Sequence, residues 1–211
     1  MKTGRLILIN AVVFLVIVAL GLGGYYYYFD QANYITTEDA KVAGDIVPIA
    51  SEGAGKLANW KGQNGATFKQ GEEVGQVAAG NQTIHITSPI EGTIVQNKAL
   101  DGQLVAAGQP LAQVVNMKKL YIMANIEETA IKDVSVGQEV DIVIDAFSDT
   151  KIKGKVAQIG LTTNSTFSLL PAQNASGDYT KEVQRIPVKI EMERYPEGIV
   201  PGMNATIKIH K

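Results

Sequence analysis

Hydrophobic and small residues between positions 47 and 114 follow one pattern that occurs twice, the second copy 37 residues after the first. The short apolar runs between the glycines are typical of strands joined by tight turns. Each copy is too small to fold alone, so we expect the two to pack about a pseudo-twofold axis as one flattened β-sandwich. The recurring positions are Ser51 and Ser88, Gly55 and Gly92, Gly65 and Gly102, Gly71 and Gly108, Gln76 and Gln113, and Val77 and Val114.

Beyond residue 117 the hydrophobic residues alternate with polar ones, which is the period of half-buried strands. About five to six such strands, one short helical segment after Glu127 and several long turns predict a small antiparallel β-barrel. The alternating positions are Leu120, Ile122, Ala124 and Ile126, then Val140, Ile142 and Ile144, then Ile186, Val188, Ile190 and Met192, and finally Ala205, Ile207 and Ile209.

The N-terminal segment is continuously apolar. Leu6–Phe29 contains 24 residues without a charge, which as a helix would extend for about 36 Å and cross a bilayer. Lys2 and Arg5 precede it, so the N-terminus should be cytoplasmic and the bulk of the chain exported. A cleaved signal peptide is the alternative, but its apolar region is usually shorter. We therefore expect a single-pass signal anchor in the inner (cytoplasmic) membrane.

These patterns divide the chain into four parts. Residues 1–30 form the cytoplasmic N-terminus and transmembrane helix, and residues 31–46 form a linker with two short strands separated by the polar Thr36–Asp39. Residues 47–116 form the two-copy sandwich, and residues 117–211 form the barrel. The fold class is therefore mainly β, with one N-terminal helix.

The second copy, "EGTIVQNKALDGQLVAAGQPLAQV", resembles half of a lipoyl or biotinyl carrier domain. The resemblance implies a barrel-sandwich hybrid in which a lysine at the tip of the central hairpin carries the cofactor. In this sequence the tip falls at Gly80–Gln82, and Asn81 replaces the lysine. An amide cannot be acylated as an amine can, so we expect no cofactor.

Three further segments resemble the membrane fusion proteins, the HlyD-type periplasmic adaptors, in their EmrA-like branch. They are "LYIMANIEETAIKDVSVGQEVDIVIDAF", "STFSLLPAQNASGDYTKEVQRIPVKIEM" and "VPGMNATIKI". Most members of that family carry a long α-helical hairpin between the two lipoyl half-motifs. Here only Ala78–Thr83 joins the halves, so we expect that hairpin to be missing.

The resemblance implies a multidrug or metabolite efflux or secretion adaptor that docks on an inner-membrane exporter. We expect an exporter of the major-facilitator type, and an ABC exporter is the second choice. The resemblance also implies a homo-oligomer, and without a hairpin an outer-membrane channel would be engaged only indirectly. The alternatives are a carrier subunit of a membrane decarboxylase, an accessory subunit of a membrane polysaccharide synthase, and a degenerate adaptor without a transport role.

Composition argues against catalysis and nucleic-acid binding. Residues 30–211 hold 17 basic and 21 acidic side chains, a formal charge of −4, and the chain has no cysteine. A metal or nucleophile site would have to use His85, expected on an exposed strand face, or His210, expected in a frayed end. Two carboxylate pairs, Glu127–Glu128 in a helical turn and Asp141/Asp145 on a strand, lack any sign of burial. We expect no enzyme activity and no metal.

One segment is a candidate for partner contact. Residues 162–182 form a 21-residue stretch without clear periodicity, and loops of that length are often functional. Its apolar residues would contact a partner, cap an open end of the barrel, or do both. The candidate contact residues are Phe167, Ser168, Leu169, Leu170, Pro171, Gln173 and Asn174.

Overall fold

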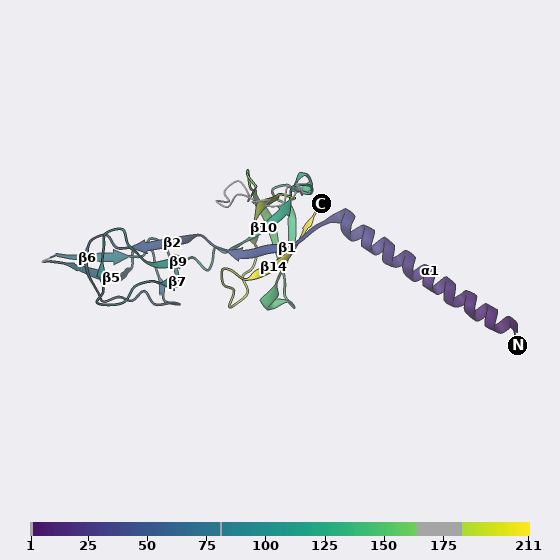
Figure 1. The fold of residues 1–211 in the computed structure, drawn as a ribbon, viewed down its shortest axis with the longest axis horizontal. Helices are drawn as coiled ribbons and strands as arrows, with labels where there is room; N and C mark the ends of the chain where they lie inside the picture. Colours follow the sequence, from purple (N-terminus) through teal and green to yellow (C-terminus); the bar gives the residue numbers. More distant parts are fainter. Residues whose placement is uncertain (1, 81, 164–182) are drawn as a thin grey trace, which may run out of the picture. The chain divides into compact units, whose positions relative to one another are not determined.

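The computed structural model describes residues 2–80, 82–163 and 183–211, with the backbone alone for residues 2–10, 27, 30 and 31. It contains one α-helix, two short 3₁₀ helices and strands in three sheets. Packing divides the described chain into two compact units, the first with α1 and most of the barrel strands, the second with both four-stranded sheets. Figure 1 shows the elements along the chain.

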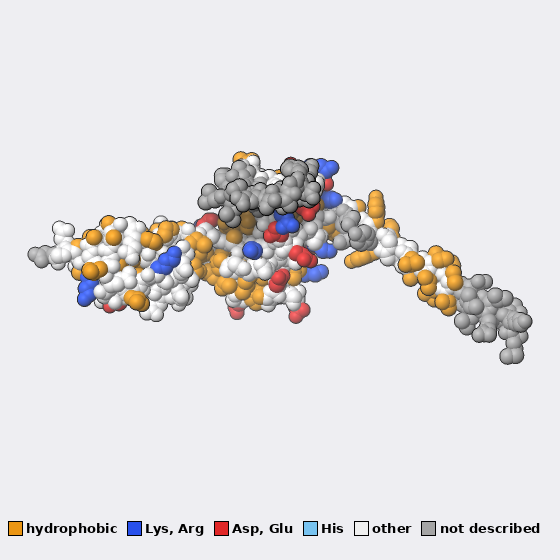
Figure 2. All heavy atoms as spheres, viewed as in Figure 1, with side chains coloured by type: hydrophobic (Ala, Val, Ile, Leu, Met, Phe, Trp, Pro, Cys, Tyr) orange, Lys and Arg blue, Asp and Glu red, His pale blue; other side chains and the backbone are white. Residues whose placement is uncertain are grey.

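The N-terminal helix, α1, spans Lys2–Asn33, and hydrophobic side chains cover its described part in Figure 2. As far as their residues are described, none of the helices combines the length and the apolar character that crossing a membrane requires. The predicted transmembrane anchor is therefore not confirmed and stays a prediction.

The sandwich consists of two four-stranded sheets with the orders β2-β9-β7-β4 and β6-β5-β3-β8. The strands β2, β3, β4 and β5 of the first copy correspond to β6, β7, β8 and β9 of the second, 37 residues later. When each strand is replaced by its counterpart in the other copy, the order of the first sheet becomes the order of the second. Each sheet therefore contains strands from both copies of the repeat. The strands are β2 (Ile46–Ala50), β3 (Gly55–Ala58), β4 (Thr67–Phe68), β5 (Glu73–Ala79), β6 (Gln82–Thr87), β7 (Gly92–Asn97), β8 (Leu104–Val105) and β9 (Pro110–Val115).

The repeat extends to individual hydrogen bonds, which are exchanged reciprocally between the copies. The amide of Ser51 donates to the carbonyl of Gln109 and that of Ser88 donates to the carbonyl of Glu72, both at 2.9 Å. The two hydroxyls each donate to a carbonyl two residues ahead, at 2.6 and 2.8 Å. Both serines are buried, so these bonds satisfy polar groups that would otherwise be costly inside the fold.

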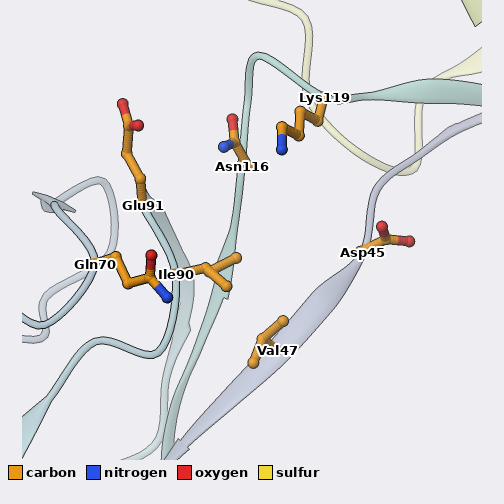
Figure 3. Close-up of a pocket in the computed structure, with 7 residues that line it drawn as sticks. All are labelled: Asp45, Val47, Gln70, Ile90, Glu91, Asn116 and Lys119. Carbon is orange, nitrogen blue, oxygen red and sulfur yellow. The ribbon is translucent and has the colours of Figure 1, made fainter.

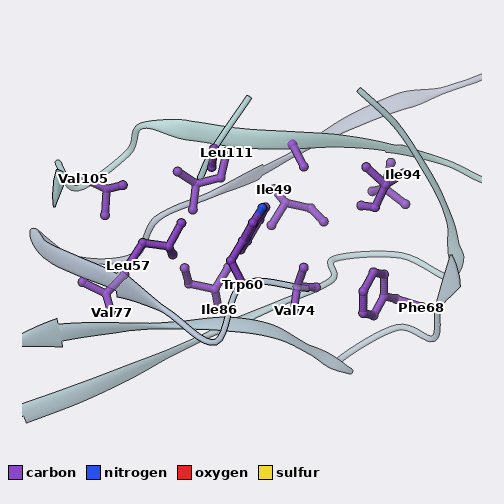
Figure 4. Packing of buried hydrophobic residues seen from close by; sticks show 13 residues of the cluster. Ile49, Leu57, Trp60, Phe68, Val74, Val77, Ile86, Ile94, Val105 and Leu111 are labelled. Atoms are coloured by element: carbon purple, nitrogen blue, oxygen red, sulfur yellow. The ribbon is translucent and has the colours of Figure 1, made fainter. Parts of the chain in front are cut away.

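Buried apolar residues fill the space between the two sheets (Figure 4). The only tryptophan of the chain, Trp60, lies among them. The cluster also contains Ile49, Leu57, Phe68, Val74, Val77, Ile86, Ile94, Ala99, Val105, Leu111, Ala112 and Val114. The predicted sandwich with one shared core is confirmed.

The remaining strands close into a barrel in the order β1-β10-β13-β12-β11-β14. The predicted alternation is confirmed, since Ile122, Ile142 and Ile207 are fully buried. The strands are β1 (Tyr34–Ala43), β10 (Tyr121–Glu127), β11 (Glu139–Ile144), β12 (Lys151–Ile159), β13 (Arg185–Met192) and β14 (Asn204–His210), and the 3₁₀ helices are η1 (Ile131–Asp133) and η2 (Asp145–Phe147).

The strand ahead of the sandwich differs from its prediction. Thr36–Asp39 does not interrupt it but lies inside β1. The polar side chains are accommodated because β10 supplies partners for them: the Thr37 hydroxyl donates to the Asn125 carbonyl at 3.2 Å, and the Asn125 amide donates to Asp39 Oδ1 at 3.0 Å. The domain limits predicted from the sequence stay a prediction.

Candidate functional site

The predicted partner-contact residues, Phe167, Ser168, Leu169, Leu170, Pro171, Gln173 and Asn174, lie outside the described residues. The strands on either side of them are described. The amide of Gly160, just after β12, donates to the carbonyl of Pro187 in β13 at 2.7 Å. The segment from 161 to 184 therefore leaves and rejoins the barrel between two neighbouring strands.

A polar cluster lies where this segment rejoins the barrel. Arg185, the first residue of β13, donates to Asp39 Oδ2, and Asp39 also accepts the amide of Asn125. Arg185 and Asn125 border a recess of about 100 Å³, which Glu127 and Ala130 also line. The cluster fixes β1, β10 and β13 together at the base of the segment that holds the predicted contact residues.

The hairpin at the centre of the sandwich is short. In β5 and β6, which run side by side in Figure 1, Ala79 pairs with Gln82, so only residues 80 and 81 separate the paired positions. Gly80 has a φ of 61°, a left-handed conformation that glycine adopts readily. Asn81 lies outside the described residues. The prediction that no helical hairpin is inserted here is confirmed.

His85 lies on the exposed side of β6, as predicted, with 58% of its side chain accessible. Its Nδ1 is hydrogen-bonded to Glu73 Oε2 on β5. This bond, and next a hydrogen bond from Gln76, lower the pKa of the Glu73 carboxyl below its ordinary value of 4.5. Among the described residues, no group of three or more histidine and acidic side chains is arranged to hold a metal ion.

The other titratable candidates do not converge. His210 is not frayed, because it lies in β14, is hydrogen-bonded to Asp141 Oδ2 at 3.2 Å and contacts the Tyr34 ring edge-on at a centroid distance of 4.9 Å. Asp145 belongs to η2 and not to the polar face of a strand. Glu127 ends β10, and Glu128 is exposed beside it. This carboxylate pair therefore precedes the predicted helical turn, which is the single-turn η1.

A surface groove of about 410 Å³ lies at one end of the sandwich unit. In Figure 3, Val47 and Ile90 extend toward one another across it, with Asn116 and Lys119 along one side. Asp45, Gln70 and Glu91 complete the lining. The Tyr121 hydroxyl lies 3.3 Å from Asp45 Oδ1, and burial, followed by the Asp45 charge, raises the pKa of this phenol above its ordinary value of 10. The groove therefore has a lining of mixed polarity.

Sequence patterns could not locate this groove. Its residues come from the ends of several strands and turns, and no spacing rule connects Gln70 with Lys119 or Asp45. In the structure Val47 and Ile90 are half-buried, and the sequence contains no signal that marks them as groove residues.

Comparison with known proteins gives matches over most of the chain. Residues 45–116 match the family described as YhbJ, barrel-sandwich hybrid domain. Residues 120–209 match the YknX-like beta-barrel domain. The candidate efflux system component YhbJ of Bacillus subtilis (strain 168) is 46% identical over 209 residues, which cover 99% of this chain and 94% of that protein.

A second relative is the multidrug export protein EmrA of Escherichia coli (strain K12), 37% identical over 131 residues. These residues are 59% of this chain and 33% of that protein. Among solved structures, ZneB from Cupriavidus metallidurans shares the fold with a TM-score of 0.62 at 16% identity, over 85% of this chain and 98% of that one. The periplasmic adaptor protein EmrA does so with a TM-score of 0.56 at 13% identity, over 84% and 98%.

Proposed function

Since this chain belongs to the membrane fusion protein family, the adaptor proteins of efflux systems, we propose that it is a membrane-anchored adaptor subunit that docks on an inner-membrane exporter. One observation carries the proposal: the sandwich and the closed barrel occur together in a chain 46% identical to an efflux component over nearly its whole length. The role is assembly and not catalysis.

The proposed anchor is the uncharged run Leu6–Phe29, within α1. Lys2 and Arg5 would keep the N-terminus on the cytoplasmic side, because basic flanks remain there. The sandwich and the barrel would then lie on the outer side of the inner membrane.

The proposed docking element is the segment containing Phe167–Pro171, with Gln173 and Asn174. It begins and ends between β12 and β13, and the polar cluster around Arg185 and Asp39 supports its base. Apolar side chains presented from a fixed base can bind a partner with a smaller entropic cost than a free segment. The partner is an exporter of the major-facilitator type, with an ABC exporter as the second choice.

The short β5–β6 hairpin limits what this chain can contact by itself. With only two residues between the paired positions, an outer-membrane channel would be reached only through another protein. We also propose that several copies assemble around one exporter. The transported compound, multidrug or metabolite, is part of the same proposal and would follow from the identity of the exporter.

The test is a mild-detergent pull-down of the tagged full-length chain, with mass spectrometry of the proteins that are captured. A polytopic exporter should co-purify with the natural chain and be lost with the triple variant Phe167→Ser, Leu169→Ser, Leu170→Ser. The matched control is Leu100→Ser with Leu104→Ser, which changes exposed leucines of the sandwich. Capture of a polysaccharide synthase in place of an exporter would show that the proposal is wrong.

A further inference from the structure

A second groove, of about 320 Å³, lies between the end of α1 and the barrel wall within the first compact unit. One side of it is aromatic, with Tyr26 and Phe29 from α1 and Tyr34 from β1. The other side is mostly polar and contains two lysines. Its residues are Asp141, Val143, Lys151, Thr206 and Lys208.

The lysines lie on the outer surface of the barrel because successive residues of a strand face opposite sides. In β12, Ile152 and Val156 are buried, and the lysines that alternate with the buried positions, Lys151, Lys153 and Lys155, are exposed. In the pairing of β11 with its neighbours, Asp141 lies opposite Lys153 on β12 and opposite Lys208 on β14. Four lysines from two strands therefore flank β11 on one face of the barrel.

The acidic residue of the groove has cationic or polar partners in the wall itself. Asp141 Oδ1 lies 3.8 Å from Lys153 Nζ, and Asp141 Oδ2 lies 3.2 Å from His210 Nε2. Lys208 Nζ lies 5.8 Å from the centre of the Tyr34 ring. Among the described residues that line the groove, two lysines, Lys151 and Lys208, stand against the single carboxylate of Asp141.

The aromatic side is accessible to solvent. Tyr26 is 74% exposed and Phe29 is 47% exposed, although rings of this size usually lie buried in soluble domains. Aromatic rings at the end of an apolar helix are typical of the interface between hydrocarbon and headgroups. A ligand of this groove should therefore be anionic at one end and apolar at the other.

We propose that this groove binds an anionic phospholipid of the membrane that holds α1. Lys151 and Lys208 bind the phosphate, and Tyr26 and Phe29 contact the glycerol and the first acyl carbons. The inference rests on the anchor in the proposed function, because only an anchored α1 brings Tyr26 to the headgroup level. An acidic protein segment would satisfy the lysines but would leave the rings of Tyr26 and Phe29 in water.

Bound lipid would give the barrel a defined orientation on the membrane. A helix alone lets the domain that follows it tilt relative to the membrane surface, whereas a second attachment on the barrel wall restricts that tilt. The barrel would then present the segment between β12 and β13 to an exporter in a reproducible direction.

The test uses the full-length chain in nanodiscs and in mild detergent. Native mass spectrometry should detect phosphatidylglycerol retained on the natural chain in preference to phosphatidylcholine. The variant Lys151→Gln with Lys208→Gln should weaken phosphatidylglycerol binding roughly tenfold or more, because two cations near the phosphate are lost. The control variant, Lys56→Gln with Lys98→Gln, removes two exposed sandwich lysines and should bind as the natural chain does.

A second variant tests the aromatic half. Tyr26→Ala with Phe29→Ala should lower the retention of both lipids, with circular dichroism as the check that the barrel is folded. Equal phosphatidylglycerol binding by the natural chain and the Lys151/Lys208 variant would overturn the inference while leaving exporter capture as a separate result. A chain that fails to enter nanodiscs at all would overturn the anchor, and the inference with it.

Discussion

The indole N–H of Trp60 donates a hydrogen bond to Asn97 Oδ1 at 3.1 Å, and these two residues occupy the same position in the two copies of the 37-residue repeat. Their backbone amides form equivalent hydrogen bonds: Trp60 N donates to Asp101 Oδ1, and Asn97 N donates to Asn64 Oδ1. The bond therefore joins the copies close to their pseudo-twofold axis. The same place holds a large ring in one copy and a polar acceptor in the other.

Asn97→Ala should destabilise the sandwich. Asn97 Oδ1 accepts bonds from Trp60 Nε1 and from the amide of Ala99 at 3.0 Å, so the substitution leaves two partly buried donors without this acceptor. We expect a loss of about 1–3 kcal/mol in the free energy of unfolding. Urea unfolding monitored by the fluorescence of Trp60 measures this loss. Gln96→Ala, an exposed neighbour, should change the free energy of unfolding by less than about 0.5 kcal/mol, and equal effects would contradict the assignment.

Gly92→Ala should also destabilise the sandwich. A Cβ at Gly92 would lie 2.5 Å from the carbonyl oxygen of Val115, and one at Gly55 would meet the carbonyl of Ala78. Neither backbone can move easily inside a paired sheet, so each substitution should cost about 1–3 kcal/mol. The same fluorescence assay compares both with Gly24→Ala, whose added Cβ has no neighbour within 4 Å. If Gly92→Ala left the free energy of unfolding unchanged, the paired strands would separate more readily than their packing indicates.

The hydrogen bond between Glu73 and His85 should make the stability of the folded chain depend slightly on pH. The pKa of Glu73 is lowered in the folded chain, so its stabilising contribution is present above the ordinary value of 4.5 and is lost as the pH falls through the lower folded value. His85→Ala should move the pKa of Glu73 back toward 4.5, because the largest cause of the shift is the hydrogen bond from His85. Carboxyl carbon chemical shifts from an NMR titration would show this, and His210→Ala should leave Glu73 unchanged.

Ile142→Ala should loosen the barrel more than the sandwich. Ile142 is fully buried and pairs with Ile152 and Ile207 on its two neighbouring strands. A cavity at this place should cost about 2–5 kcal/mol. Hydrogen exchange should quicken in β11 and β14 before it does in β5. Val136→Ala, at a position 65% exposed, serves as the control and should leave exchange in all three strands as it is.

The sequence predicted those features of the fold that local rules determine. Ser51 and Ser88 lie at equivalent places because the two copies of the repeat fold alike. Ile142 and Ile207 are buried, as alternation predicts, because successive residues of a strand face opposite sides. The prediction that Thr36–Asp39 breaks the strand was wrong, because polar groups on β10 form hydrogen bonds with Thr37 and Asp39. Such compensation comes from residues nearly 90 positions away and leaves no local signal.

The site was predicted less completely for the same reason. The missing helical hairpin could be inferred, because it depends on chain length between Ala78 and Thr83. The grooves at Val47 and at Lys151 could not, because each combines residues from separate strands. The candidate contact residues around Phe167 stay a prediction.

The exchange of strands between the two sheets constrains the order in which the sandwich can form during synthesis. Among the strands that the structure describes, β2 pairs only with β9 and β4 pairs only with β7, so a nascent chain that ends at Thr87 lacks both of these partners. β3 and β5 of the first copy can pair with one another and with β6, but β2 and β4 must wait for strands of the second copy. The first four-stranded sheet, β2-β9-β7-β4, can therefore form only after the second copy of the repeat has been synthesised.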